Sequence, residues 1–214
     1  MKNFINFIKK YKKNDVIFFR HAKTSLNNGT FLGVGRNPGI INKKKVKINL
    51  KKYSKIKNII VYTSALRRAT ETADFISKEK YILSNELKEK NYGKAEGFNY
   101  EQLKHTYPSI IKQWFEKKDP KFPLGENDKD LIKRINRFKK KIINQSQKIK
   151  KRRTIIIVTH NALLRCLIGD SFDIPKFMWH KIYIDHIKPI YFIIKQKTII
   201  PNTNRMNLFK HMNK

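Results

Sequence analysis

The chain has 214 residues, with 49 Lys and Arg against 16 Asp and Glu, so its formal net charge is +33. This length suits one α/β domain with a substantial core, and we expect a single domain over residues 1–214. Cys166 is the only cysteine, which excludes an intrachain disulfide, and no apolar run approaches membrane-spanning length. These features predict a cytoplasmic protein without a transmembrane segment.

The excess of positive charge has two explanations. A field of this strength attracts polyanions. The lysines are, however, spread along the chain together with many Asn and Ile residues, as a bias toward AT-rich codons would produce. Because neither a nucleic-acid-binding module nor a confined basic face with interleaved aromatic residues is evident, we expect no specific nucleic-acid partner. Weak association with anionic surfaces stays open, and the sequence does not define the oligomeric state.

Residues 1–13 (MKNFINFIKKYKK) place apolar side chains on one side of a predicted helix and lysines on the other. Such a helix packs on the domain or touches an anionic membrane. Asn6 and the lysines interrupt the apolar stretch, and no small-residue cleavage site follows, so the segment does not resemble a signal peptide.

Three short apolar runs, at 16–19, 58–63 and 155–159, predict buried parallel strands, because they are β-branched or aromatic and do not alternate with polar residues. Arg20 and His21 directly follow the first run, and His160 directly follows the third. The carboxyl ends of such strands hold ligands. One histidine alone is typical of a core position, whereas two at neighbouring strand ends, one beside an arginine, predict a shared site.

The residue types at this predicted site suit phosphoryl transfer. The planar arginine side chain matches phosphate, and an imidazole can attack phosphorus to form a covalent intermediate. The following segment, 27–39, holds four of the 8 glycines, which predicts a loop near the site, with Asn27 as a candidate phosphate ligand.

A helix is predicted over 65–73, with Ser64 as its N-cap. Arg67 and Arg68 lie in its first turn, about 100° apart around the axis, so only one of them can face the site.

Two further helical stretches, around 100–117 and 128–149, predict a helical cap over 99–150. Its aromatic side chains could line a substrate cleft, although helically spaced aromatics more often serve packing. These residues are Tyr100, Tyr107, Trp114, Phe115 and Phe122.

Five blocks resemble, in order, the motifs of the histidine phosphatase superfamily, the phosphoglycerate mutase-like proteins. They read RHAKTSLN (20–27), SALRRATETA (64–73), LKEKNYGKAEG (87–97), PLGEN (123–127) and VTHNALLRCL (158–167), and 199–204 looks like the family's closing strand and loop. Ala22, Lys23 and Asn161 depart from the residues usual in these motifs.

The resemblance implies an α/β fold, a three-layer sandwich with a mostly parallel central sheet flanked by helices, plus a helical cap insertion. It also implies that His21 attacks a phosphoryl group, that Arg20, Arg68 and His160 stabilise its oxygens, and that Glu89 protonates the leaving group. Glu86 is a second carboxyl candidate from its position alone, whereas Glu96 and Glu126 are more typical of surface charges.

The shorter phosphatase branch fits best, which predicts a phosphomonoesterase acting on a small phosphorylated metabolite without metal or cofactor. A phosphoglycerate mutase-type transfer and a non-catalytic polyanion-binding relative are the alternatives. For the enzyme, His21 must be unprotonated and His160 charged or donating, so we expect their pKa values to be pushed apart.

Overall fold

The computed structural model describes residues 15–78, 80–148 and 153–202, so the predicted helix at 1–13 and the end of the closing loop lie outside the described residues. Six strands form one sheet in the order β3-β2-β4-β1-β5-β6. They are β1 (Asp15–Arg20), β2 (Ile59–Ser64), β3 (Ile82–Ser84), β4 (Thr154–Thr159), β5 (Pro189–Lys195) and β6 (Thr198–Pro201). The first four run parallel and β5 runs against β1, so the sheet is mostly parallel, as predicted.

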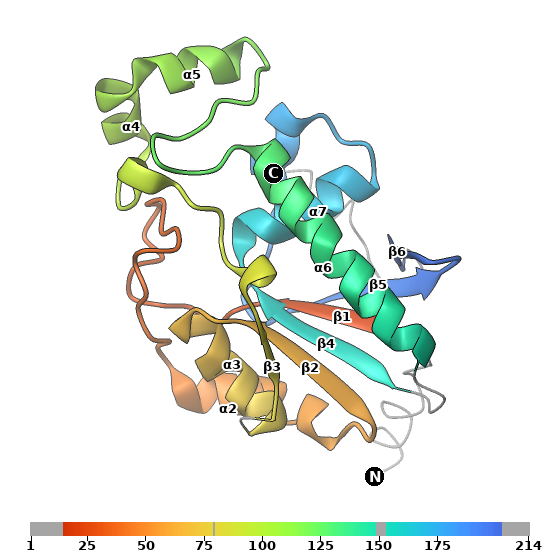
Figure 1. Cartoon of the computed structure of the whole chain (residues 1–214). Coiled ribbons are helices and arrows are strands. Elements are labelled where there is room, and N and C mark those ends of the chain that lie inside the picture. The colour runs from red at the N-terminus through yellow and green to blue at the C-terminus, as the bar shows by residue number, and fades with distance from the viewer. Residues whose placement is uncertain (1–14, 79, 149–152, 203–214) are drawn as a thin grey trace.

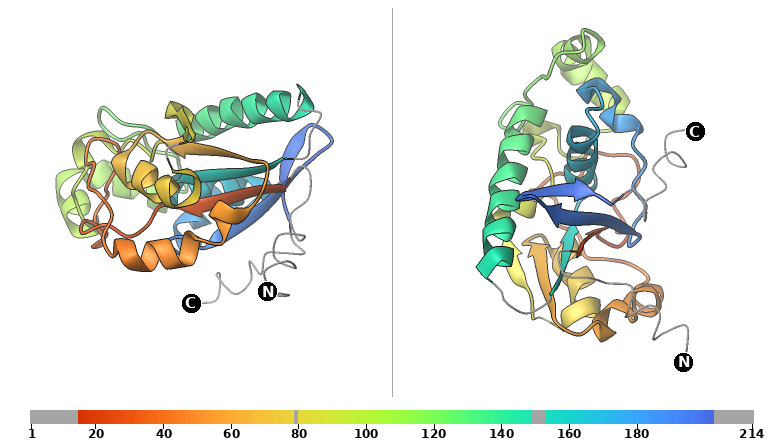
Figure 2. Two further views of the ribbon diagram at one scale, coloured as in Figure 1. Left: turned by 90° about the horizontal axis from the view of Figure 1, so that it is seen from below. Right: turned by 90° about the vertical axis from the view of Figure 1, so that its right-hand side faces the viewer.

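Helices cover both faces of this sheet (Figures 1 and 2). One layer holds α2 (Lys43–Leu50) and α3 (Arg67–Ser77), and the other holds α6 (Asp128–Lys148) and α7 (Asn161–Ser171). Short 3₁₀ turns complete the connections: η1 (Tyr53–Lys55), η2 (Asn85–Leu87), η3 (Gly93–Ala95) and η4 (Lys176–Lys181). The three-layer α/β sandwich is therefore confirmed.

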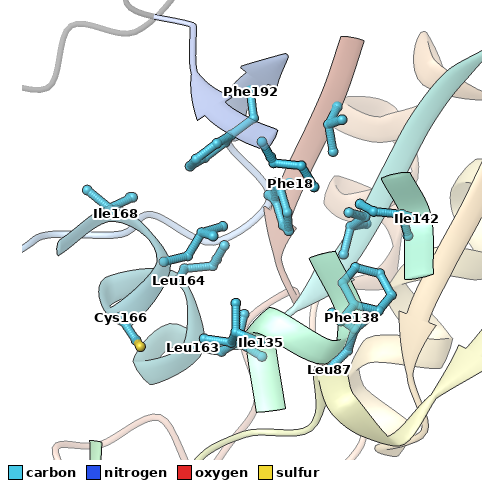
Figure 3. Packing of buried hydrophobic residues seen from close by; sticks show 14 of the residues in the cluster. Phe18, Leu87, Ile135, Phe138, Ile142, Leu163, Leu164, Cys166, Ile168 and Phe192 are labelled. Atoms are coloured by element: carbon cyan, nitrogen blue, oxygen red, sulfur yellow. The ribbon is translucent and has the colours of Figure 1, made fainter. Parts of the chain in front are cut away.

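The alternation of side chains along β1 shows why its apolar run is continuous. Val16 and Phe18 pack in the core under α6 and α7, whereas Ile17 and Phe19 pack in the core on the α2 and α3 side. Figure 3 shows the first of these cores, where Phe138 of α6 lies among the side chains that cover the sheet. The run 16–19 is buried on both faces of the sheet and has no polar position, as the sequence suggested.

The segment predicted as a cap divides into two parts. Its first part forms α4 (Tyr100–Thr106) and α5 (Pro108–Phe115), separated at Pro108, which ends the preceding helix. These helices lie beyond one end of the sheet in Figure 1 and share a separate apolar cluster with Phe122. Its second part, α6, packs on the sheet with α7, so a cap running over 99–150 is not confirmed.

The cap aromatics behave mainly as packing residues. Tyr107, Trp114 and Phe122 belong to that separate cluster, while Tyr100 and Phe115 are exposed to solvent. No helix within the described ranges is both long and apolar enough to cross a membrane.

The predicted N-cap of α3 is wrong. Ser64 is the last residue of β2, and the helix begins at Arg67 with Leu66 at the N-cap position. The Ser64 hydroxyl accepts a hydrogen bond from the Leu66 N–H at 3.2 Å, so it serves the turn before the helix. The same hydroxyl lies 2.8 Å from His160 Nε2.

Candidate active site

The ends of β1 and β4 bring His21 and His160 together. The parallel register pairs Arg20 with Thr159, and the His21 N–H donates to the Thr159 carbonyl at 2.9 Å. The two imidazole centroids lie 5.1 Å apart, and both rings are buried. The predicted convergence of the two histidines is therefore a feature of the structure.

The contacts of His21 define its tautomer. Its Nδ1 lies 2.7 Å from the Ala22 carbonyl oxygen, which can only accept, so Nδ1 carries the proton. Nε2 is left with a lone pair and makes no hydrogen bond to the described residues. Burial, followed by the charge of Arg68, holds the pKa of His21 well below its usual value, so the ring is neutral at physiological pH.

The ring of His160 is fixed from two sides. Arg68 Nε donates to His160 Nδ1 at 3.2 Å, so Nε2 carries the proton and faces the Ser64 hydroxyl at 2.8 Å. Burial and then Arg68 hold the pKa of His160 well below its usual value. Both pKa values are thus lowered, because both rings are buried and lie beside the same guanidinium, and a divergence between them stays a prediction.

Arg68 is the arginine of α3 that faces inward. It is fully buried, and besides His160 it donates to the Gly33 carbonyl at 2.7 Å and to the Arg36 carbonyl at 2.9 Å. It thereby ties the predicted glycine-rich loop to the site. Arg67 instead points to solvent and pairs with Glu71 one turn along the helix, which confirms that only one of the two arginines faces the site.

Arg20 brings an N–H donor that has no acceptor in the described part of the chain. Its Nη1 donates to the Ile184 carbonyl at 2.9 Å, but its buried Nε has no hydrogen-bond partner among the described residues. Burial lowers the pKa of Arg20 to about 10. A buried donor without a partner is costly, and an anion is the acceptor that suits a guanidinium.

Glu89 reaches the same region from the segment between η2 and η3. Its Oε1 accepts from the Lys90 N–H at 3.0 Å and from the Ala162 N–H, in the first turn of α7, at 3.1 Å. The side chain is buried, and Arg20 and Arg68 both sense its charge. The structure thus groups Glu89 with the two arginines, as the family spacing implied.

Asn27 is less directly connected to this group. Its Oδ1 accepts from the N–H and the hydroxyl of Thr24 at 2.8 and 3.1 Å, which closes a tight turn after His21. No hydrogen bond links it to the other candidates within the described chain, so its role as a phosphate ligand stays a prediction.

Two glutamates expected to be surface charges instead hold loops. Glu96 accepts from the N–H groups of Val34 and Gly35, both at 2.8 Å. Glu126 forms an ion pair with Arg134 at 2.9 Å. Neither forms a hydrogen bond with the two histidines among the described residues.

The departures from the family motifs fit the local backbone. Ala22 is buried and is not among the described residues with a left-handed backbone, and its N–H donates to the Thr72 hydroxyl at 2.9 Å. The methyl group therefore causes no backbone strain. Asn161 begins α7, and its Oδ1 is buried without a partner in the described part of the chain. Lys23 is exposed.

Sequence reasoning missed His186 and Arg165. His186 Nδ1 donates to the His21 carbonyl at 2.6 Å, and its ring centroid lies 5.4 Å from that of His21. Burial, with Arg20 next, lowers the pKa of His186 to about 4. Arg165 donates to the Ile182 carbonyl at 2.7 Å and senses the charge of Glu89. Arg165 could have been found from its place in the helix after His160, whereas His186 carries no periodic signal.

Within 15–78, 80–148 and 153–202, no group of three or more His, Cys, Asp or Glu side chains is arranged to hold a metal ion. Positive charge at the two histidines comes instead from guanidinium groups.

Comparison with known proteins assigns the chain to a family. A model of the histidine phosphatase superfamily (branch 1) matches residues 16–195, and the chain belongs to this superfamily. Among solved structures, the alpha-ribazole phosphatase from Shigella flexneri has a TM-score of 0.73 at 20% identity, covering 88% of this chain and 94% of that one. At this identity the likeness concerns the fold.

Two curated relatives match shorter stretches. Fructose-2,6-bisphosphatase from Saccharomyces cerevisiae is 26% identical over 120 residues, or 56% of this chain and 25% of that protein. Phosphoglycerate mutase from Schizosaccharomyces pombe is 31% identical over 118 residues, or 52% of this chain and 55% of that protein. The chain thus spans about a quarter and about half of the lengths of these relatives.

Proposed function

We propose that the protein is a phosphomonoesterase that works through a phosphohistidine intermediate at His21, without a metal ion. The observation that carries this proposal is the tautomer of His21. Its Nδ1–H is bound to the Ala22 carbonyl, so Nε2 presents a lone pair beside Arg20 and Arg68. A neutral imidazole held in this way is a nucleophile, and the guanidinium groups suit the charge of a phosphoryl group.

In the first step, His21 Nε2 attacks phosphorus, the N–P bond forms and the P–O bond to the leaving group breaks. Arg20 Nε, which has no partner among the described residues, donates to a phosphoryl oxygen, and Arg68 adds a second cation. His160 donates from Nε2–H, which it otherwise gives to Ser64.

Glu89 completes both steps as acid and then as base. Its Oε1 accepts two backbone N–H groups, so the transferable proton belongs on Oε2. This proton passes to the leaving oxygen. In the second step the carboxylate takes a proton from water, water attacks phosphorus, the N–P bond breaks and inorganic phosphate is released.

We propose a small phosphorylated metabolite as substrate, in line with a relative named fructose-2,6-bisphosphatase and a structural neighbour named alpha-ribazole phosphatase. The similarity to a phosphoglycerate mutase supports one alternative, in which a bound hydroxyl replaces water as the acceptor. Isomerisation of a phosphoglycerate without release of inorganic phosphate would favour the mutase.

The test is hydrolysis of p-nitrophenyl phosphate with chelator present, by the wild type, His21→Ala and His21→Asn. Loss of the nucleophile should lower the rate by at least about 10⁴-fold. The asparagine amide can keep the hydrogen bond to the Ala22 carbonyl, which separates chemistry from folding. His105→Ala is the matched control, because His105 is exposed on α4. An acid-labile phosphoryl group on the wild type but not on the His21 variants would identify the intermediate.

Full activity in both His21 variants would contradict the proposal. Absence of turnover in the wild type, together with polyanion binding that falls steeply with salt, would favour the non-catalytic relative instead.

A further inference from the structure

The proposed acid, Glu89, lies on a segment that has no regular secondary structure. Residues 88–91 lie between η2 and the N-cap of η3, so their carbonyl groups join no strand or helix. Buried carbonyl groups need hydrogen-bond donors from elsewhere in the molecule. The main source of these donors is Arg134, on the inner side of α6.

Arg134 donates to three backbone carbonyl groups in and just before this segment. Its Nη1 donates to the Glu86 carbonyl at 2.7 Å and to the Lys88 carbonyl at 2.8 Å, and its Nη2 donates to the Glu89 carbonyl at 3.1 Å. The remaining donors, on Nε and Nη2, go to the two carboxylate oxygens of Glu126, both at 2.9 Å. A guanidinium has five N–H groups, and every one of them has an acceptor here.

Glu126 holds the other end of the same segment. Its Oε2 also accepts from the Asn91 N–H at 2.9 Å, and its own N–H donates to the Asn91 carbonyl at 2.8 Å. The Arg134 and Glu126 side chains are 11% and 21% exposed, so water competes little for these contacts. We call this pair the acid clamp, because it holds residues 86–91 on both sides of Glu89.

We infer that Arg134, together with Glu126, is a positioning residue for Glu89: the acid clamp sets the backbone from which the carboxyl group reaches the leaving oxygen. This inference rests on the proposed function. Proton transfer requires hydrogen-bond reach, and a displacement of about 1 Å can slow a reaction about 100-fold. The same pair explains the sequence block at 123–127, whose glutamate lies away from the histidines.

Lysine at position 134 is the informative substitution. It keeps the positive charge, which acts with burial and Arg68 on the pKa of His160, but it replaces a five-donor fork by a single ammonium. A changed rate in Arg134→Lys therefore reports the geometry of the segment and not the field at His160.

The experiment compares two leaving groups in the wild type, Arg134→Lys and Glu126→Gln. p-Nitrophenolate leaves with little help, whereas the alkoxide released from an alkyl phosphate such as glycerol phosphate needs a proton from Glu89. We expect kcat/KM to fall about 30-fold or more for the alkyl phosphate and less than about 5-fold for p-nitrophenyl phosphate. A residue that only stabilised the fold would lower both rates equally, and that result would overturn the inference.

Two matched controls lie on the same helix. Arg137→Lys changes an exposed arginine, and Ile142→Val loosens the core that α6 forms with the sheet. Neither should alter the ratio of the two rates. A shift of that ratio in Ile142→Val would mean that general loosening of α6 explains the effect, which would also overturn the inference.

Amide hydrogen exchange separates this inference from the proposed function. In Arg134→Lys the amides of residues 86–91 should exchange about tenfold or more faster, while those of β1 and β4 keep their protection. If the wild type turns over no phosphoester, the proposed function fails, and unchanged exchange at 86–91 would independently show that the acid clamp does not hold the segment.

Discussion

The nucleophile and the proposed acid are held in opposite ways. His21 follows β1, which pairs with β4 on one side and β5 on the other, and main-chain groups of Thr159 and Ala22 fix its backbone and ring. Glu89 lies on an irregular segment that side chains from α6 and 123–127 hold in place. Backbone architecture therefore positions one reacting group, and distant side chains position the other.

Apart from loss of the nucleophile itself, the largest effect is expected at Arg68, which contacts His160 and lies close enough to Glu89 to be affected by its charge. Arg68→Lys removes the guanidinium group whose N–H donors bind His160 and the carbonyls of Gly33 and Arg36. We therefore expect kcat to fall about 100- to 1,000-fold. Steady-state kinetics with p-nitrophenyl phosphate measure this loss. Arg67→Lys is the neighbouring control and should stay within about twofold, because its ion pair with Glu71 is exposed. Equal losses in both variants would refute the assignment of Arg68.

Glu89→Gln tests whether Glu89 donates the proton to the leaving group. The amide keeps the shape of the side chain but has no acidic proton to transfer. An alkyl phosphate should therefore react about 100-fold more slowly, whereas p-nitrophenyl phosphate should slow less than about tenfold. Brønsted plots over a series of phenols and alcohols would reveal a steeper dependence on the leaving group. An unchanged slope would remove Glu89 from the acid role.

The buried histidine His186 beside the nucleophile makes the stability of the folded protein sensitive to acid. His186 has its pKa lowered to about 4, below the unfolded value near 6.5, so the unfolded chain takes up this proton first. Its contribution to stability is complete above about pH 6.5 and is lost as the pH falls toward 4. Melting temperatures from pH 7.5 to 5 should therefore fall less in His186→Asn than in the wild type. An identical fall would contradict this assignment.

The smallest effect concerns Ala22, which stands where glycine is usual in the family motif. Since its backbone is not left-handed, Ala22→Gly relieves no strain and should lower stability by about 0.5 to 1 kcal/mol through the unfolded state. Activity should stay within about twofold. Chemical denaturation and the p-nitrophenyl phosphate assay test both statements, and a stabilised or much faster variant would show that the methyl group does hinder the site.

The same contrast explains what the sequence could predict. β1, β2 and β4 were evident because strands buried on both faces have no polar positions, and the histidines after β1 and β4 then had to converge. β3 was missed because it is a three-residue edge strand with exposed Ile82 and Leu83. The assignment of α6 to a cap is not confirmed, because an apolar stripe on a helix does not specify which surface the helix covers.

Within the site, the inward arginine followed from helical geometry and family spacing, but the environment of each group did not. His186 comes from an irregular segment and reaches His21 through a main-chain contact that no pattern encodes. The lowered pKa values of both His21 and His160 depend on how completely the surrounding chain excludes water. The acid clamp likewise joins residues 45 positions apart, from Arg134 to Glu89.

Cys166 offers a practical consequence of the core described above. This single thiol lies on α7 under the sheet, and burial raises its pKa, so alkylating reagents should not reach a reactive thiolate in the folded protein. Labelling of the thiol then requires opening of the layer that carries His160 and contacts Glu89. The rate of alkylation by iodoacetamide therefore reports how often the layer that supports the active site opens.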